Sequence, residues 1–149
     1  MKVVIQRVSE SSVKVDGTIV GEIGKGLMLL VGIDESDSAT DADWLVQKIL
    51  NLRIFGDEAD KLNLSVLDIK GEILCISQFT LIADYKKGNR PSFIKAAKPD
   101  KAIPLFDYFK KQISKSGLKT ESGIFGADMK VSLINDGPVT IVMYSVTKA

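Results

Sequence analysis

Two short polar segments beside apolar runs hold the residues best suited to chemistry. Ser77-Gln78-Phe79-Thr80 follows the apolar run Ile73–Ile76, and Asn135-Asp136-Gly137-Pro138-Val139-Thr140 separates two further apolar runs. Backbone N–H groups at the end of a strand can point at a developing oxyanion, and a hydroxyl of Ser77 or Thr80 can donate to it. These residues therefore suit the stabilisation of a negatively charged oxygen.

The chain contains no histidine and one cysteine, which narrows the chemistry further. Thr80 could attack a carbonyl or donate a hydrogen bond, but attack is chemically weak without a histidine to take its proton. Cys75 lies within an apolar run, and we expect it to be a small core residue. A zinc site built from histidine or several cysteines is excluded by composition.

The Gly137-Pro138 pair admits two interpretations. Asp136-Gly137 is a favoured turn pair, which predicts a hairpin between two C-terminal strands. Alternatively, a cis peptide bond before Pro138 would set two carbonyls side by side, as acceptors for an ammonium group and as a steric wall. Arg7, in the first predicted strand, is either a surface arginine or a planar donor that holds the carbonyls of this loop.

The apolar pattern predicts one mixed α/β domain over residues 1–149. Strands are expected at residues 3–8, 13–15, 18–20, 27–33, 63–67, 72–83, 129–134 and 140–146. One helix is expected to begin within 36–43 and run to Leu52, and a second to begin near Pro99–Pro104 and end at Gly117. The chain has no glycine fingerprint of a dinucleotide-binding fold.

No apolar run approaches the ~20 residues of a membrane helix, and the N-terminus lacks the pattern of a signal peptide. We therefore expect a cytoplasmic protein. The net charge of +1 conceals a basic segment, because residues 86–119 carry 10 basic and 2 acidic residues. Its first loop holds Lys86, Lys87 and Arg90. Such clustering suits contact with a phosphate backbone, although a solvated helix face and loop explain it better from charge alone.

The whole chain resembles the D-aminoacyl-tRNA deacylases, also called D-tyrosyl-tRNA deacylases. The resemblance begins with Met1–Arg7 (MKVVIQR) and includes Ser77–Leu81 (SQFTL) and Asn135–Thr140 (NDGPVT), which match the two signature motifs of that family. The stretch Gly123–Met129 is also similar. Two such motifs at this separation are very specific.

The resemblance implies a compact mixed sheet with barrel-like layers and two main helices. It also implies a homodimer without metal or organic cofactor, in which Gly137-Pro138 of one subunit enters the active site of the other. Ser77, Gln78, Phe79 and Thr80 would then surround the ester of the aminoacyl-tRNA. Further roles implied are bracing of the Gly-Pro loop by Arg7 and proximity of Phe125 and Met129 to the terminal adenosine.

The implied activity is hydrolysis of the ester of D-aminoacyl-tRNA, which is chiral proofreading in translation. Glycine has no side chain for a wall to reject, so glycine mischarged on tRNA-Ala should also be a substrate. This function would explain the positive charge of the basic loop, which we expect to contact the tRNA acceptor stem. Two rivals are a non-catalytic tRNA-binding module, disfavoured by the intact motifs, and a small-metabolite hydrolase, disfavoured by the absence of histidine.

Overall fold

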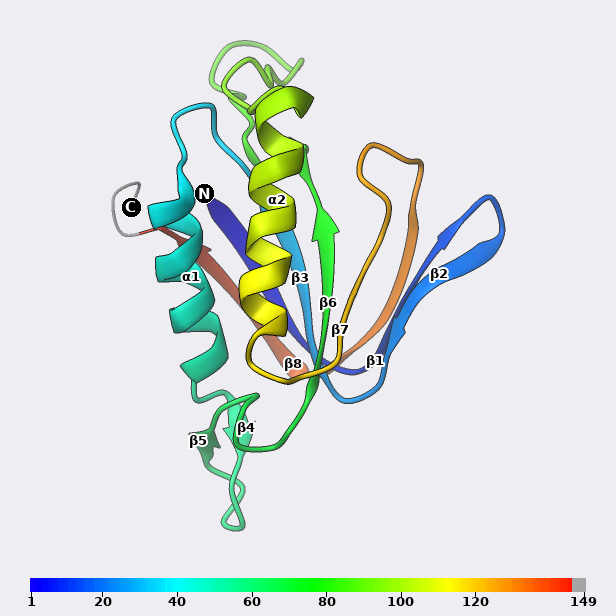
Figure 1. Cartoon of the computed structure of the whole chain (residues 1–149), viewed down its shortest axis with the longest axis vertical. Helices are drawn as coiled ribbons and strands as arrows, with labels where there is room; N and C mark the ends of the chain where they lie inside the picture. The colour runs from blue at the N-terminus through cyan, green and yellow to red at the C-terminus, as the bar shows by residue number, and fades with distance from the viewer. Residues whose placement is uncertain (146–149) are drawn as a thin grey trace.

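The computed structural model describes residues 1–145 and contains two helices on one face of a six-stranded sheet (Figure 1). The helices are α1 (Ala39–Asn51) and α2 (Pro99–Ser114), and η1 (Phe79–Leu81) is a single 3-10 turn. The strands are β1 (Lys2–Val15), β2 (Thr18–Ile23), β3 (Gly26–Gly32), β4 (Phe55–Gly56), β5 (Leu62–Leu64), β6 (Glu72–Ser77), β7 (Thr120–Ser122) and β8 (Lys130–Tyr144). Neither helix in this part of the chain is long and apolar enough to cross a membrane.

The sheet is mixed and strongly curled. Its order is β2-β1-β3-β6-β7, with β8 on the other edge of β1, and the β3–β6 and β6–β7 pairs are parallel. β1 pairs with β3 along Lys2–Val8 and with β2 along Ser11–Val15, so β1 must bend between the two partners. The curl brings β2 against β7, where a Cβ on Gly21 would lie 2.8 Å from the Ser122 carbonyl oxygen. The sheet is therefore nearly closed, like a barrel.

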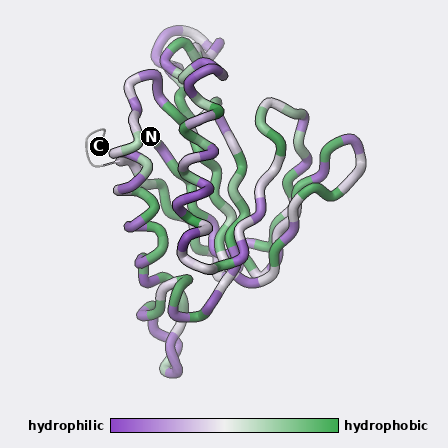
Figure 2. The backbone as a smooth tube through the Cα atoms, in the orientation of Figure 1, coloured by the Kyte–Doolittle hydropathy of each residue, from purple (hydrophilic) through white to green (hydrophobic). Residues whose placement is uncertain are grey.

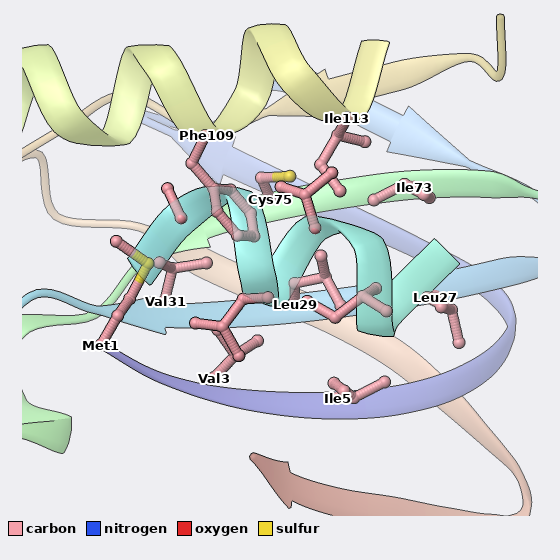
Figure 3. Close-up of a cluster of buried hydrophobic side chains, with 14 of the residues drawn as sticks. Met1, Val3, Ile5, Leu27, Leu29, Val31, Ile73, Cys75, Phe109 and Ile113 are labelled. Carbon is pink, nitrogen blue, oxygen red and sulfur yellow. The ribbon is translucent and has the colours of Figure 1, made fainter. Parts of the chain in front are cut away.

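Two apolar cores lie on opposite faces of this sheet. In β3, Leu27, Leu29 and Val31 face the helices, where they join Phe109 and other buried side chains (Figure 3). The alternate residue Met28 faces the curled interior instead. Along each helix, groups of hydrophobic residues follow groups of hydrophilic residues (Figure 2), as in helices with one buried face. The strand expected at 27–33 is therefore covered on both faces.

The C-terminal strands differ from the prediction. Residues 130–144 form one strand, β8, and both of its halves pair with β1, so the predicted hairpin turn at Asp136-Gly137 is wrong. Thr140 pairs with Gln6 and Asn135 pairs with Val8, which places three extra residues on β8 at this point. The extra residues form a bulge, because β1 pairs with β8 on both sides of them. The predicted end at Val146 lies outside the described residues.

The strand predicted over 72–83 is too long. β6 ends at Ser77, and Gln78 takes a φ of −144° and a ψ of 79° that turns the chain away from the sheet. The Leu81 N–H then donates to the Gln78 carbonyl at 3.2 Å and closes η1. The strand expected at 63–67 is limited to β5, whereas both helices lie where they were expected.

A buried ion pair ties the start of β1 to the loop before α1. The ammonium group of Met1 lies 2.6 Å from Asp37 Oδ1 and donates to Ser145 Oγ at 3.2 Å. Both charged groups are fully buried. Sequence patterns did not indicate this contact, because nothing local links residues so far apart.

Candidate active site

The turn that follows β6 exposes the residues of the first motif. Ser77 and Gln78 are half-buried, whereas Phe79 and Thr80 are exposed. The Gln78 N–H continues the ladder by donating to the Val31 carbonyl at 2.8 Å. The first N–H groups of a helical turn have no acceptor within it, and those of Phe79 and Thr80 have none among the described residues. Two backbone donors are therefore free at the end of β6.

A cavity of about 250 Å³ opens beside this turn. Ser77, Gln78 and Phe79 form one wall, and the loop Phe125–Met129 forms another. Apolar side chains of both cores line its base, among them Val31 and Ile76. The structure thus brings together five of the predicted site residues, and the size and lining suit a small, partly apolar ligand group.

Thr80 lies outside this cavity lining, on the exposed side of the turn. Its hydroxyl accepts a hydrogen bond from Gln78 Nε2. Thr80 has no ionisable partner among the described residues, so no group is placed to take its proton. The geometry favours the hydrogen-bonding role of this hydroxyl over covalent attack.

The second motif forms the bulge in β8, and the Gly137-Pro138 peptide bond is cis. Arg7 lies against this bulge and donates from Nε to the Asp136 carbonyl oxygen at 2.9 Å. Its Nη1 donates to the Ile54 carbonyl oxygen at 2.8 Å. The expectation that Arg7 holds loop carbonyls is confirmed for Asp136, the residue immediately before the Gly-Pro pair.

The bulge and the cavity lie apart within the chain. Arg7 is level with Leu27 in β3, and Leu27 is level with Ile73 in β6, four residues before Ser77. At about 3.3 Å per residue this is roughly 13 Å along the strands, in addition to the spacing between strands. One copy of the chain therefore does not unite its two motifs.

Three further polar side chains, Gln6, Asn135 and Thr140, lie around the bulge. Asn135 and Thr140 belong to the second motif, but the sequence assigned them no separate role. Asn135 Nδ2 donates to Gln6 Oε1 and, at 2.9 Å, to Thr140 Oγ1. Asn135 Oδ1 accepts from the Val139 N–H at 3.0 Å. Gln6 was missed entirely, although its place next to Arg7 on β1 was a usable signal. Consecutive strand residues point to opposite faces, so both faces of the bulge can be held from one strand.

The predicted basic loop is the tip of a small hairpin near the end of β6. Asp84 and Ser92 exchange two backbone hydrogen bonds of 2.8 Å, and Lys86, Lys87 and Arg90 lie between them, all exposed. The hairpin is joined to the first motif by an edge-on contact between Phe93 and Phe79, whose ring centroids are 5.4 Å apart. The three cations are thus held beside the exposed turn.

Cys75 takes no part in the site. Its side chain is buried in β6, and burial raises the pKa of its thiol to about 12. The prediction of a core cysteine is confirmed.

Comparison with known proteins identifies the family. The family model described as D-Tyr-tRNA(Tyr) deacylase matches residues 4–144. The chain belongs to this deacylase family. The D-aminoacyl-tRNA deacylase of Flavobacterium johnsoniae is 60% identical over 146 residues, which is 97% of each chain. The match to the family includes nearly all of β1, both motifs and all of β8.

Solved structures agree with the fold expected of a D-Tyr-tRNA(Tyr) deacylase. The c-Myc DNA Unwinding Element Binding Protein is 44% identical with a TM-score of 0.91, and the match covers 97% of this chain and 99% of the other. A probable eukaryotic D-amino acid tRNA deacylase has a TM-score of 0.85 at 17% identity, covering 95% and 97% of the two chains. At that identity the second likeness shows the fold alone. The expected mixed, barrel-like α/β fold with two helices is confirmed.

Proposed function

We propose that this protein hydrolyses the ester bond of D-aminoacyl-tRNA and releases the free D-amino acid and tRNA. The observation that carries this proposal is that one chain has both two free backbone donors beside a cavity and a Gly-Pro bulge held by Arg7. The same chain matches the deacylase family almost end to end. Its action is chiral proofreading in the cytoplasm, where charged tRNA is used.

The turn after β6 supplies the electrostatic part of the reaction. As water attacks the ester carbonyl, negative charge develops on its oxygen, and the N–H groups of Phe79 and Thr80 can donate to it. Preorganised donors of this kind need no reorganisation during the step. Water attacks the ester carbonyl, and Thr80 acts as a hydrogen-bonding group rather than as a nucleophile.

The cavity beside the turn takes the terminal adenosine of the tRNA. Phe125 and Met129 come from the loop that forms one wall, and they offer an aromatic ring and a polarisable thioether to a flat base. Ser77 and Gln78 on the opposite wall are placed between this base and the ester. This arrangement sets the carbonyl carbon near the free N–H groups.

The Gly-Pro bulge provides the selection of chirality. Carbonyl oxygens of Gly137 and Pro138 accept from the ammonium group of the substrate and exclude an L side chain by steric contact. Glycine passes this filter, because it has no side chain, so glycyl-tRNA is a second substrate. Main-chain atoms suit this task, because their positions do not depend on a side-chain rotamer.

A second copy of the chain completes the site. The face of the sheet away from the helices is open at the β1–β8 end, where Val142 is 53% exposed and Tyr144 is 43% exposed. Half-buried Val4 and Leu30 lie on the same face. We name the surface that carries these four residues the open face. Gln6 and Thr140, beside the bulge, lie on it too, so a symmetric partner packed there would meet the bulge.

The hairpin over 84–92 provides the contact with tRNA. Lys86, Lys87 and Arg90 neutralise phosphates of the acceptor stem, and the contact between Phe93 and Phe79 keeps them at a fixed distance from the ester. The name of the 44%-identical structure indicates DNA binding by that protein, and duplex DNA is therefore a necessary competitor in binding experiments.

The test is the release of labelled D-tyrosine from D-tyrosyl-tRNA, with L-tyrosyl-tRNA as the matched control. Rapid release from the D substrate alone supports the proposal. Binding of tRNA without release would identify a binding module instead, and hydrolysis of simple esters without preference for tRNA would identify a metabolite hydrolase.

The two-subunit site has its own test, which mixes Thr80→Ala and Gly137→Ala subunits by coexpression. If the bulge acts on the partner's turn, each mixed dimer contains one fully wild-type site and one doubly altered site. Random pairing then restores roughly a quarter of the wild-type activity. No recovery above the two parent variants would show that the bulge and the turn act within one chain.

A further inference from the structure

Three polar side chains on the open side of the bulge form a closed set of hydrogen bonds. Asn135 Nδ2 donates to Gln6 Oε1 and to Thr140 Oγ1, and the Thr140 hydroxyl donates to Gln6 Oε1 at 3.0 Å. Gln6 thus supplies one oxygen that accepts two hydrogen bonds. Asn135 and Gln6 are half-buried, so these contacts are partly shielded from water.

The orientation of each amide follows from the main chain. Asn135 Oδ1 accepts from the Val139 N–H at 3.0 Å, which spans residues 136–138. That contact directs the NH₂ group of Asn135 toward Gln6, and Gln6 must then present its oxygen. The side chain of Asn135 therefore closes the bulge only while an acceptor stands opposite its NH₂ group.

Gln6 and Arg7 act from opposite faces of the sheet. Arg7 lies on the helix side, where it donates to Asp136 and Ile54. Gln6, as the adjacent residue in β1, points to the open side, where it meets Asn135 and Thr140. The bulge that carries Gly137 is thus held from both faces of the sheet. On one face Arg7 bonds to Asp136, and on the other Gln6 accepts from Asn135 and Thr140, which lie at the two ends of the bulge.

We propose that Gln6 is a positioning residue for chiral discrimination. It acts through Asn135, by fixing the bulge whose Gly137 and Pro138 carbonyls face the substrate. This inference rests on the proposed function. The chemistry required of residue 6 is a hydrogen-bond acceptor of glutamine length, and its NH₂ group is not needed for the contacts with Asn135 and Thr140.

The test compares Gln6→Leu, which removes the acceptor, with Gln6→Glu, which keeps an acceptor oxygen at the same distance. Gln47→Leu, on the exposed side of α1, is the matched control. Hydrogen exchange of the Val139 amide reports on the bulge without any substrate. Hydrolysis of D- and L-tyrosyl-tRNA reports on discrimination, and denaturant unfolding shows that each variant is folded.

We expect Gln6→Leu to speed Val139 exchange about tenfold, the scale of one lost hydrogen bond. The same variant should slow D-tyrosyl-tRNA hydrolysis about tenfold and lower the ratio of D to L rates, while Gln6→Glu stays within roughly threefold of the wild type. If Gln6→Leu does not fold, Thr140→Val removes both hydroxyl contacts, to Asn135 and to Gln6, and should change the same readouts in the same direction.

Three results would overturn the inference: unchanged Val139 exchange in Gln6→Leu, equal impairment of Gln6→Glu and Gln6→Leu, or a lower D rate with an unchanged D-to-L ratio. Failure of the proposed function is a different result, in which the wild-type protein itself does not hydrolyse D-tyrosyl-tRNA. Val139 exchange would then still decide whether Gln6 holds the bulge.

Discussion

Arg7 holds the Asp136 carbonyl oxygen at 2.9 Å, one residue before Gly137, and leaves no room for a side chain there. A Cβ on Gly137 would lie 2.6 Å from Arg7 Nη2. Because Nε and Nη1 of the same guanidinium are both engaged, it cannot move away without losing a hydrogen bond. The brace of the bulge therefore depends on the absence of a side chain at residue 137.

We predict that Gly137→Ala lowers the free energy of unfolding by roughly 2–4 kcal/mol, from its backbone conformation and from crowding together. Gly137 has a φ of +132°, which side chains rarely adopt. The measurement is urea unfolding. Gly88→Ala is the control, because Gly88 also has a positive φ, of +64°, but has open space around it. Equal losses in the two variants would mean that Arg7 is not in the way.

Thr80→Ala should slow hydrolysis of D-tyrosyl-tRNA by about 10²–10³ or less, the effect of losing one oxyanion donor. The reason is that Thr80 has no base to activate it, and its hydroxyl is instead bonded to Gln78. Single-turnover rates check the magnitude. Mass spectrometry of the quenched wild-type reaction checks the mechanism, since an acyl ester on Thr80 would contradict it.

Neutralising Lys86, Lys87 and Arg90 together should weaken tRNA binding and reduce its log–log salt dependence by about one unit per lost contact. Hydrolysis of a minimal aminoacyl-adenosine should change little, because the hairpin lies beyond that substrate. Neutralising the exposed Lys14 and Lys25 is the control for net charge. Similar losses on tRNA and on the minimal substrate would show that the hairpin is only structural.

Asp37→Asn should lower the free energy of unfolding by about 3–5 kcal/mol, because it leaves the buried Met1 ammonium group without its counter-charge. Asp107→Asn removes an exposed partner of Lys110 and should cost less than about 1 kcal/mol. Guanidinium unfolding of both variants measures the difference. Comparable values would mean that the Met1–Asp37 pair is not shielded from solvent.

The stability of the protein should fall above pH 9. The folded pKa of Cys75, about 12, lies above its ordinary value of 9.0, so the unfolded thiol ionises first as the pH rises. The free energy of unfolding then decreases between pH 9 and 12, by at most about 1.4 kcal/mol per pH unit. Cys75→Ala should lack this component, and the difference in pH slope between the two proteins measures it. Identical slopes would refute burial as the cause.

Local patterns predicted the helices and the two-faced strand β3 well, because helical period and continuous apolar runs are properties of neighbouring residues. They overran β6, since Phe79–Ile82 is apolar enough for a strand, but the bonds from Leu81 to Gln78 and from Ile82 to Phe79 form a turn there. They also split β8 at Asp136-Gly137, where a turn pair is overridden by the pairing of both halves with β1. Long-range pairing of this kind leaves no local signal.

The candidate site was predicted in part. The choice of Ser77–Thr80 as candidate residues and the contact of Arg7 with the bulge followed from the motifs, but the turn at Ser77–Thr80 did not, because a strand was predicted there. The roles of Gln6 and of the Met1–Asp37 pair did not, because each depends on strands brought together by the sheet. Residue type alone could not separate Gln6 from an ordinary strand glutamine.

The bulge in β8 also determines which way the end of the chain faces. Before it, Val131 and Leu133 point into the curled interior, and after it, Ile141 and Met143 point toward the helices. Three extra residues, an odd number, produce this reversal. Deleting or inserting one residue within 136–139 would turn the last part of β8 inside out. The length of this segment is therefore fixed by the core, because it decides which side chains of the last part of β8 face the helices.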